Sequence, residues 1–280
     1  MNVMVTLFIY IILAQSWNLI GGYTGQVNLG IVAFFGISAM VTHFLWKAGA
    51  PIYLAIPTGS LSSVVLAALI GLPTLRLRGM YFAVGTLALA QAAQTIVANI
   101  FTRSVSMPGS FSATYSLMPR YYLGLIMVVI AITVVYVITR TKIGLAMVAI
   151  RDDEQAAQVT GVRVFKYKVI AFLISGILAG LAGGLYAYVR LSFWQISIVF
   201  SPSWTFDALL AVVIGGAGTL AGPVIGSVFL VVISEIFANT LGQAHLILFG
   251  LLFILVVIYF PYGLIGSVDR IHQLITRVRK

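Results

Sequence analysis

The sequence predicts an all-α polytopic membrane protein with about 8–10 transmembrane helices, some of them broken or re-entrant. Hydrophobic residues make up 61% of the 280 residues and charged residues only 8%, against roughly 25% charged in a soluble domain. The mean hydropathy of the chain is +1.10. Apolar runs of about 20 residues, long enough to cross a bilayer as helices, recur throughout. These observations exclude a secreted enzyme, a disordered regulator and a nucleic-acid-binding module.

Apolar runs interrupted by Gly, Pro or charged residues define the predicted spans in chain order. They cover 3–20, 28–46, 53–75, 79–101, 121–139, 168–189, 204–216, 223–240 and 245–261. The run over 204–216 is short for a crossing and enters the glycine-rich stretch from Gly215 to Pro223, which predicts a break in the helix. A crossing near 20–30 could be re-entrant. Together the spans form a single transmembrane domain over 1–280.

The basic residues are distributed unequally between the two faces of the membrane. The chain has 16 Lys and Arg against 6 Asp and Glu, a net charge of +10. Alternating spans place most of the basic residues on one face, in 140–168, in the tail 266–280 and at Arg76 and Arg78. The other face receives Lys47, Arg103, Arg120 and Arg190. The positive-inside rule makes the first face cytoplasmic, so the C-terminus is internal, the N-terminus external and the surplus charge favours anionic lipid.

The sequence contains no motif for nucleotide hydrolysis, metal binding or nucleophilic catalysis. No phosphate-binding loop is present, so ATP hydrolysis is not expected on this chain. The three histidines are far apart and cysteine is absent, so no metal ligand set is predicted. An intramembrane enzyme or an assembly protein stays an alternative without a supporting motif.

The segment 140–168 contains three of the six acids. Asp152, Asp153 and Glu154 would favour the positive end of a helix that begins near Arg151. Two alanines follow, and Gly161 is a typical C-terminal stop. The pattern predicts a short cytoplasmic helix.

The spacing of that helix resembles the Glu-Ala-Ala-x-x-x-Gly signature of ABC importer permeases, in which a short cytoplasmic helix docks on the ATPase. Gln155 stands where the signature has Glu. An ordinary solvated loop helix is the alternative. The resemblance implies ATPase coupling by Arg151, Asp152, Asp153, Glu154, Gln155, Ala156, Ala157 and Gly161. On that basis we call the predicted helix the coupling helix.

Three further segments resemble branched-chain amino acid ABC permeases, most closely the M-type subunit. They are Gly22-Tyr-Thr-Gly-Gln-Val-Asn-Leu-Gly30, Arg78-Gly-Met-Tyr-Phe-Ala83 and the glycine-rich stretch from Gly215 to Gly226. The resemblance runs from about residue 10 to 265 in the family's order. Asn28 replaces the usual Ser, and Ile31 stands where a His is common, which leaves the substrate open.

The resemblance implies a type II-like ABC importer permease in a prokaryotic cell (inner) membrane. Such a subunit carries branched-chain or related amino acids that an extracytoplasmic binding protein delivers. Its partners are a second related permease, forming a heterodimer, and ABC ATPases that hold ATP and Mg; no cofactor is expected on this chain. Urea, amides or small carboxylates are alternative substrates, and a stand-alone secondary transporter is the rival class.

Polar residues in and between the spans are candidates for the translocation pathway. Gln26 and Asn28 lie in a glycine-flanked break, where irregular backbone requires protein or water around it. Asp207 and Glu235 are acids within spans, although Asp207 could be an interfacial anchor and Glu235 could extend to the interface. Gln91 and Gln94 share one side of a helix, and either hydrogen bonds between helices or a pathway lining explains them. Small-residue spacing indicates close helix packing at Gly176, Gly180, Gly184, Gly218, Gly222 and Gly226.

Overall fold

The computed structural model describes residues 2–77, 79–101, 104–106, 116–190, 193–241 and 263–264. Its long helices are α1 (Asn2–Gly21), α2 (Ile31–Lys47), α3 (Ile52–Thr74), α4 (Met80–Ile100), α6 (Leu117–Thr139), α9 (Val164–Val189) and α12 (Gly222–Leu241). Shorter elements are α7 (Lys142–Asp152), α8 (Glu154–Val159), α10 (Ile196–Val199), α11 (Ser203–Gly215) and the strands β1 (Ser104–Ser106) and β2 (Phe193–Gln195).

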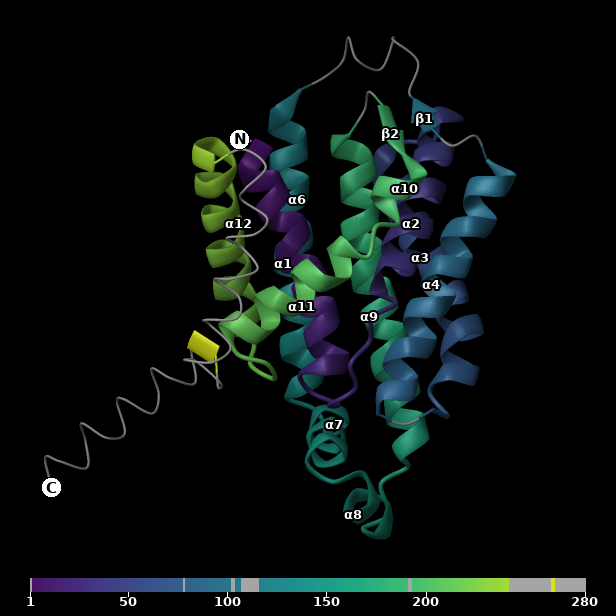
Figure 1. Ribbon diagram of the computed structural model, residues 1–280, viewed down its shortest axis with the longest axis vertical. Coiled ribbons are helices and arrows are strands. Elements are labelled where there is room, and N and C mark those ends of the chain that lie inside the picture. Colours follow the sequence, from purple (N-terminus) through teal and green to yellow (C-terminus); the bar gives the residue numbers. More distant parts are fainter. Residues whose placement is uncertain are drawn as a thin grey trace, which may run out of the picture.

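Most of the long helices run lengthwise through the molecule and form a bundle with two distinct ends, while α11 crosses it obliquely (Figure 1). The helices α7 and α8 project from one end, which we call the α7–α8 end. The strands β1 and β2 and the start of α1 lie towards the opposite end, which we call the strand end. The strands pair antiparallel, with Ser104 opposite Gln195. Among the described residues this small ladder is an addition to the predicted all-α fold.

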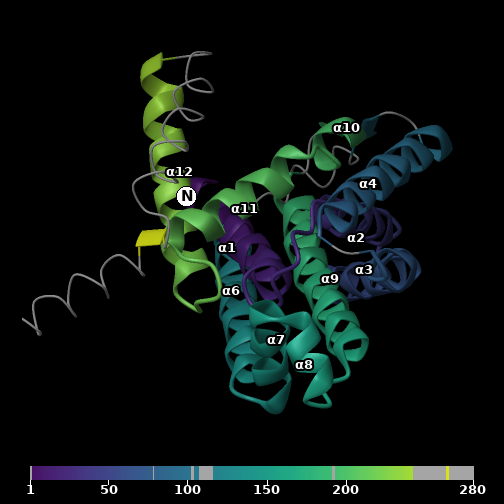
Figure 2. The ribbon, with the colours of Figure 1, turned by 60° about the horizontal axis from the view of Figure 1, so that its bottom comes forward.

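Helix α9 is the centre of the packing. It packs most extensively against α1, α2 and α3, and Figure 2 shows it between α1 and α6 on one side and α2 and α3 on the other. Phe34 of α2 and Phe172 of α9 are buried and stack edge-to-face with ring centroids 5.3 Å apart. Helices α4 and α12 lie on opposite sides of this core (Figures 1 and 2).

The predicted polytopic all-α fold is confirmed. Six helical segments in the described part of the chain are long and apolar enough to span a membrane, and α2 and α12 are shorter apolar helices. Eight of the predicted spans coincide with helices. The span 245–261, the tail 266–280, Arg78 and Arg103 lie outside the described residues.

The crossing predicted over 204–216 begins earlier than its apolar run suggested. Helix α10 precedes α11 at the strand end, and together they give an apolar segment over Ile196–Gly215. Three residues, Phe200 to Pro202, separate the two helices. The sequence concealed this extension because Pro202 and its two serine neighbours resemble a loop.

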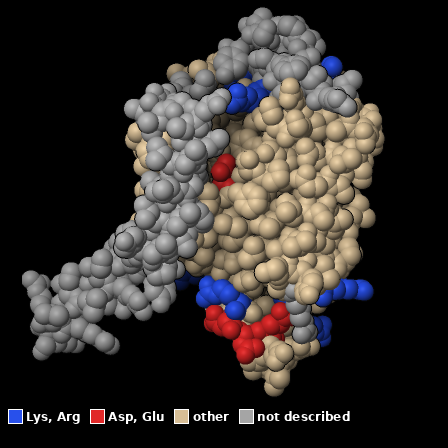
Figure 3. Space-filling view, viewed as in Figure 1, with Lys and Arg blue, Asp and Glu red and all other residues tan. Residues whose placement is uncertain are grey.

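Charged side chains gather at the ends of the molecule (Figure 3). Acidic and basic side chains cluster together at the α7–α8 end, and a broad uncharged band separates them from basic side chains at the strand end. One acidic position is visible in a hollow of that band. Such a band is expected of a protein that crosses a bilayer, because a charge at the bilayer centre is costly.

Candidate functional site

Asp153 divides the predicted coupling segment into two helices. Its backbone is extended (φ −157°, ψ 113°), so α7 ends at Asp152 and α8 begins at Glu154. The Asp153 carboxylate accepts hydrogen bonds from the backbone N–H groups of Gln155 at 2.8 Å and Ala156 at 3.0 Å, which is the geometry of a helix N-cap. The prediction that the coupling helix begins near Arg151 is therefore wrong: Arg151 and Asp152 form the last turn of α7.

Helix α8 presents an exposed face beyond the bundle. It ends at Val159, and Gly161 follows with φ +89°, a conformation that suits glycine. Ala157 is buried, whereas Gln155 and Ala156 are exposed and Val159 is 88% exposed. Helix α8 therefore presents Gln155, Ala156 and Val159 on its exposed side and Ala157 on its buried side.

Two basic side chains attach the pair α7–α8 to the rest of the bundle. Lys168 of α9 is buried and its Nζ lies 2.6 Å from Glu154 Oε2 at the start of α8. Arg151 Nη1 donates a hydrogen bond of 3.1 Å to the carbonyl oxygen of Gly22, directly after α1. The Arg151 Nε also lies 3.3 Å from Asp152 Oδ1. Sequence reasoning missed both attachments, since neither pairing has a local pattern.

Amide side chains of α1 bind the glycine-rich turn between α11 and α12. Asn18 donates from Nδ2 to the Thr219 carbonyl oxygen and accepts from the Gly218 N–H, both at 2.8 Å. Gln15 donates from Nε2 to the Leu220 carbonyl oxygen at 2.8 Å. Both amides are fully buried. The sequence did contain a signal for this contact, namely two amide side chains within an apolar span. Irregular backbone inside a membrane needs hydrogen-bond partners, and side-chain amides can supply them.

The same helix meets acids nearer the strand end. The Tyr10 hydroxyl donates to Asp207 Oδ2 at 3.1 Å. Tyr10 also lines a pocket of about 280 Å³ together with Thr6, Ser234 and Glu235. The face of α1 towards α11 and α12, with Tyr10, Gln15 and Asn18, thus forms a polar line along the helix, which we call the α1 seam.

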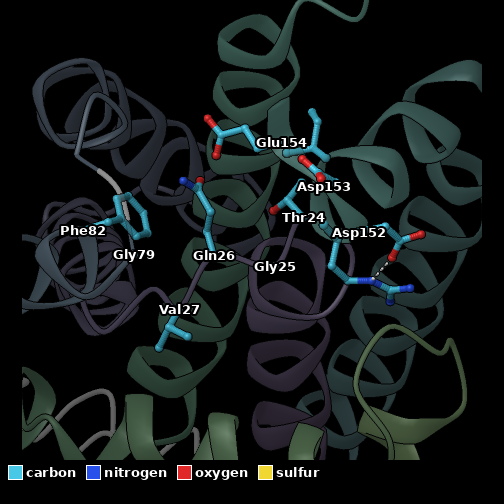
Figure 4. A pocket seen from close by; sticks show the side chains of 11 residues that line it. Thr24, Gly25, Gln26, Val27, Gly79, Phe82, Asp152, Asp153 and Glu154 are labelled. Carbon is cyan, nitrogen blue, oxygen red and sulfur yellow. Dashed lines mark hydrogen bonds and ion pairs between the residues drawn. The ribbon is translucent and has the colours of Figure 1, made fainter. Parts of the chain in front are cut away.

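A second, larger pocket lies at the α7–α8 end (Figure 4). Its volume is about 440 Å³, and the loop after α1 supplies Gln26 to its lining while α7 and α8 supply Asp152 and Glu154. Nearby, burial raises the pKa of the Tyr23 hydroxyl above its ordinary value, because desolvation disfavours the phenolate more than Thr139 and Arg151 favour it. This pocket lies between the loop after α1 and the helices α7 and α8.

The six predicted pathway residues lie in separate places. Gln26 lines the larger pocket, and Asp207 and Glu235 both lie beside Tyr10. Gln91 and Gln94 are on α4, across the core from α12. Asn28 is buried and caps its own turn, with Oδ1 accepting from the Gly30 N–H at 2.8 Å.

The predicted packing glycines lie at two helix contacts. A Cβ on Gly176 would lie 3.0 Å from Ala67 Cβ of α3, and one on Gly184 would lie 2.8 Å from Ile56 Cγ2. Gly180 faces Ser60 and Ser63 of α3. In the second group Gly222 and Gly226 begin α12, and Gly226 abuts the Ala211 carbonyl of α11. Gly218 differs from the prediction of a helical stripe, since it lies in the turn with φ +76°.

Within the described residues, no three His, Cys, Asp or Glu side chains gather where they could hold a metal ion. The bundle of apolar helices, with two irregular backbone segments within it, has the architecture of a polytopic membrane protein.

Comparisons with known proteins identify the family. A family profile described as branched-chain amino acid transport system / permease component matches residues 1–257. The chain belongs to this family. It is 29% identical, over 92% of its length and 68% of the relative's, to the high-affinity branched-chain amino acid transport system permease protein LivM of Salmonella typhimurium. LivM of Escherichia coli is 28% identical over the same shares.

More distant relatives transport other solutes. The ribose import permease protein RbsC of Haemophilus influenzae is 27% identical over 70% of this chain and 62% of its own. No solved structure matches the chain significantly.

Proposed function

We propose that this chain is the permease subunit of an ATP-driven ABC importer that carries branched-chain or related amino acids. The observation that carries the proposal is the family match over residues 1–257. The similarity to LivM proteins over 92% of the chain supports branched-chain amino acids over ribose, because the ribose permease matches less of the chain.

The exposed face of α8 is our proposed docking surface for the partner ATPase, which would bind ATP and Mg. Its two capped ends and its attachment through Glu154 and Arg151 make it a rigid short helix. Docking there makes the α7–α8 end cytoplasmic and the strand end, with the N-terminus, external. A second related permease and an extracytoplasmic binding protein complete the importer, and the tail 266–280 would be cytoplasmic.

For the substrate route we propose the α1 seam. An amino acid carries an ammonium and a carboxylate, so its passage requires groups that accept and donate hydrogen bonds. Glu235 and the Tyr10–Asp207 pair offer acceptors in the half of the seam near the strand end, and Gln26 lines the pocket at the α7–α8 end. Gln91 and Gln94 lie on α4, apart from this seam, and stay predictions for the translocation pathway.

Uptake by the reconstituted importer tests this function. Proteoliposomes that contain this chain, the second permease, the ATPases and the binding protein are supplied with labelled leucine, with and without ATP inside. We expect ATP-dependent uptake that unlabelled isoleucine and valine suppress, while urea and ribose do not. Gradient-driven uptake by the chain alone would instead support a secondary transporter, and suppression by urea or ribose would reassign the substrate.

A further inference from the structure

Three segments that are distant in the sequence meet at the Arg151 side chain. Its Nη1 binds the Gly22 carbonyl oxygen at the end of α1. A Cβ placed on Gly25 would lie 2.9 Å from Arg151 Cγ, and one on Gly218 would overlap Arg151 Nη1. Arg151 of α7 therefore contacts both irregular backbone segments, the loop 22–30 after α1 and the glycine-rich turn 216–221, at one point.

The chemistry of this contact suits a guanidinium. The Gly22 carbonyl directly follows the C-terminus of α1, where unpaired carbonyls and the helix dipole favour a cation. The approach requires two glycines, since a Cβ on Gly22 would lie 2.5 Å from the Gly218 N, and one on Gly218 would lie 3.0 Å from the Gly22 carbonyl oxygen. The two backbones therefore touch directly, with the Arg151 side chain beside them.

Asn18 makes the contact stiff. One amide binds Gly218 and Thr219 simultaneously, and it belongs to the last turn of α1, four residues before Gly22. A movement of the Gly22 carbonyl therefore displaces the glycine-rich turn as well. Because α12 begins at Gly222, the displacement reaches a helix that lines the α1 seam.

We propose that Arg151 is a positioning residue that transmits movement of α7 and α8 to both breaks at once. This inference rests on the proposed function, in which the ATPase moves α8. Lys168 offers a rival route, since its ion pair with Glu154 links α8 to α9 alone. If Arg151 transmits the movement, the glycine-rich turn stops moving when the Arg151 side chain is removed. If Lys168 transmits it, the turn still moves.

The first measurement is the number of ATP molecules hydrolysed per leucine imported by the complete importer. Arg151→Gln should reduce uptake about tenfold while ATP hydrolysis stays within about twofold, as a lost coupling interaction predicts. Arg151→Lys should retain part of the uptake, because it keeps the charge but replaces the planar fork by one ammonium. Arg76→Gln removes the same charge from an exposed site at the same end and should leave the ratio unchanged.

The second measurement detects the movement itself. The chain has no cysteine, so introduced pairs are unambiguous. Spin labels at Gln158→Cys and at Ala217→Cys, each paired with Ala48→Cys at the strand end, report α8 and the glycine-rich turn; all three sites are exposed. Trapping with a non-hydrolysable ATP analogue should change both distances in the parent, and only the α8 distance in Arg151→Gln.

The outcomes are separable. Absence of ATP-dependent uptake by the unsubstituted importer overturns the proposed function. If that importer works and Arg151→Gln retains the parent's ratio of ATP to leucine, the inference is wrong. It is equally overturned if the turn still moves in Arg151→Gln, or if uptake and hydrolysis fall together in both Arg151 variants.

Discussion

The Nζ of Lys168 lies 2.6 Å from Oε2 of Glu154, and this ion pair joins the start of α8 to α9. The lysine is 3% exposed, whereas the glutamate side chain is 36% exposed. The two residues therefore depend on the ion pair to different degrees. The lysine is cut off from water and has the carboxylate in its place, whereas the glutamate is still partly hydrated.

Glu154→Gln should destabilise the protein more than Lys168→Met. The first change leaves a buried ammonium without its carboxylate, at a cost on the order of 2 kcal/mol after allowance for the exposed glutamate. The second removes the charge and retains an apolar stem of similar length. Thermal unfolding in detergent should give a lower midpoint for Glu154→Gln than for Lys168→Met and the parent. A midpoint for Glu154→Gln equal to that of the parent would show that the ion pair contributes no stability.

Asp153→Ala should unwind α8. The carboxylate satisfies two N–H groups of a helix of only six residues, and loss of an N-cap costs about 1 kcal/mol. Hydrogen exchange of the amides 154–159 should accelerate and uptake should fall. Asp153→Ser keeps a capping oxygen and should retain both properties, so equal behaviour of the two variants contradicts the role of the cap.

Gly161→Ala should impair uptake through the backbone alone. No atom lies within 4 Å of a Cβ at this position, yet φ is +89°, and a side chain in the left-handed region costs about 1 kcal/mol. Gly161→Asn, which tolerates this region better, should lose less. An uptake for Gly161→Ala equal to that of the parent would refute the requirement for glycine.

Ala156 and Ala157 should respond differently to enlargement. Ala156 is exposed on the proposed docking face, whereas Ala157 is 4% exposed beneath it. Ala156→Leu should abolish ATP-coupled uptake at unchanged unfolding temperature, since it obstructs only the ATPase. Ala157→Leu should lower the unfolding temperature, because overpacking costs about 1–3 kcal/mol. Normal uptake by Ala156→Leu would remove α8 from the interface.

Gly180→Ala should destabilise the contact between α3 and α9. The added Cβ would lie 2.8 Å from Ser60 Cα, a backbone atom that cannot yield without moving α3. Gly85→Ala is the matched control, because its Cβ would meet side-chain atoms alone, the flexible end of Leu77 at 3.0 Å and Thr74 Cγ2 at 4.0 Å, and alanine favours helix by about 1 kcal/mol. Unfolding midpoints should therefore fall for Gly180→Ala and not for Gly85→Ala.

Composition and run length predicted most of the fold, but not the packing. The helix boundaries follow from apolar runs and their breakers, so α1 and α3 lie within a few residues of their predicted spans. The apolar runs do not indicate which face of α1 packs against the other helices. Lipid and protein core are both apolar, so a spanning helix can be hydrophobic on every face and need not show an amphipathic pattern.

The candidate site was predictable only where its signal is local. The short helix and the glycine that ends it could be predicted from adjacent residues. The start of α8 was predicted too early, because each of three consecutive acids suits the first turn of a helix equally well. Arg151 and Gly22 are 129 residues apart, and Asn18 and Thr219 are 201 apart. A single sequence contains no signal that pairs such distant polar residues.

The strands β1 and β2 have a consequence for how the chain assembles. Ser104 and Gln195, which face each other in this ladder, enclose α6, α7, α8 and α9 between them. Closing so long a segment is entropically costly until its helices have packed. The ladder should therefore form late in folding, after the helices between its strands have packed. Loss of either strand should then leave the folding of those helices unchanged.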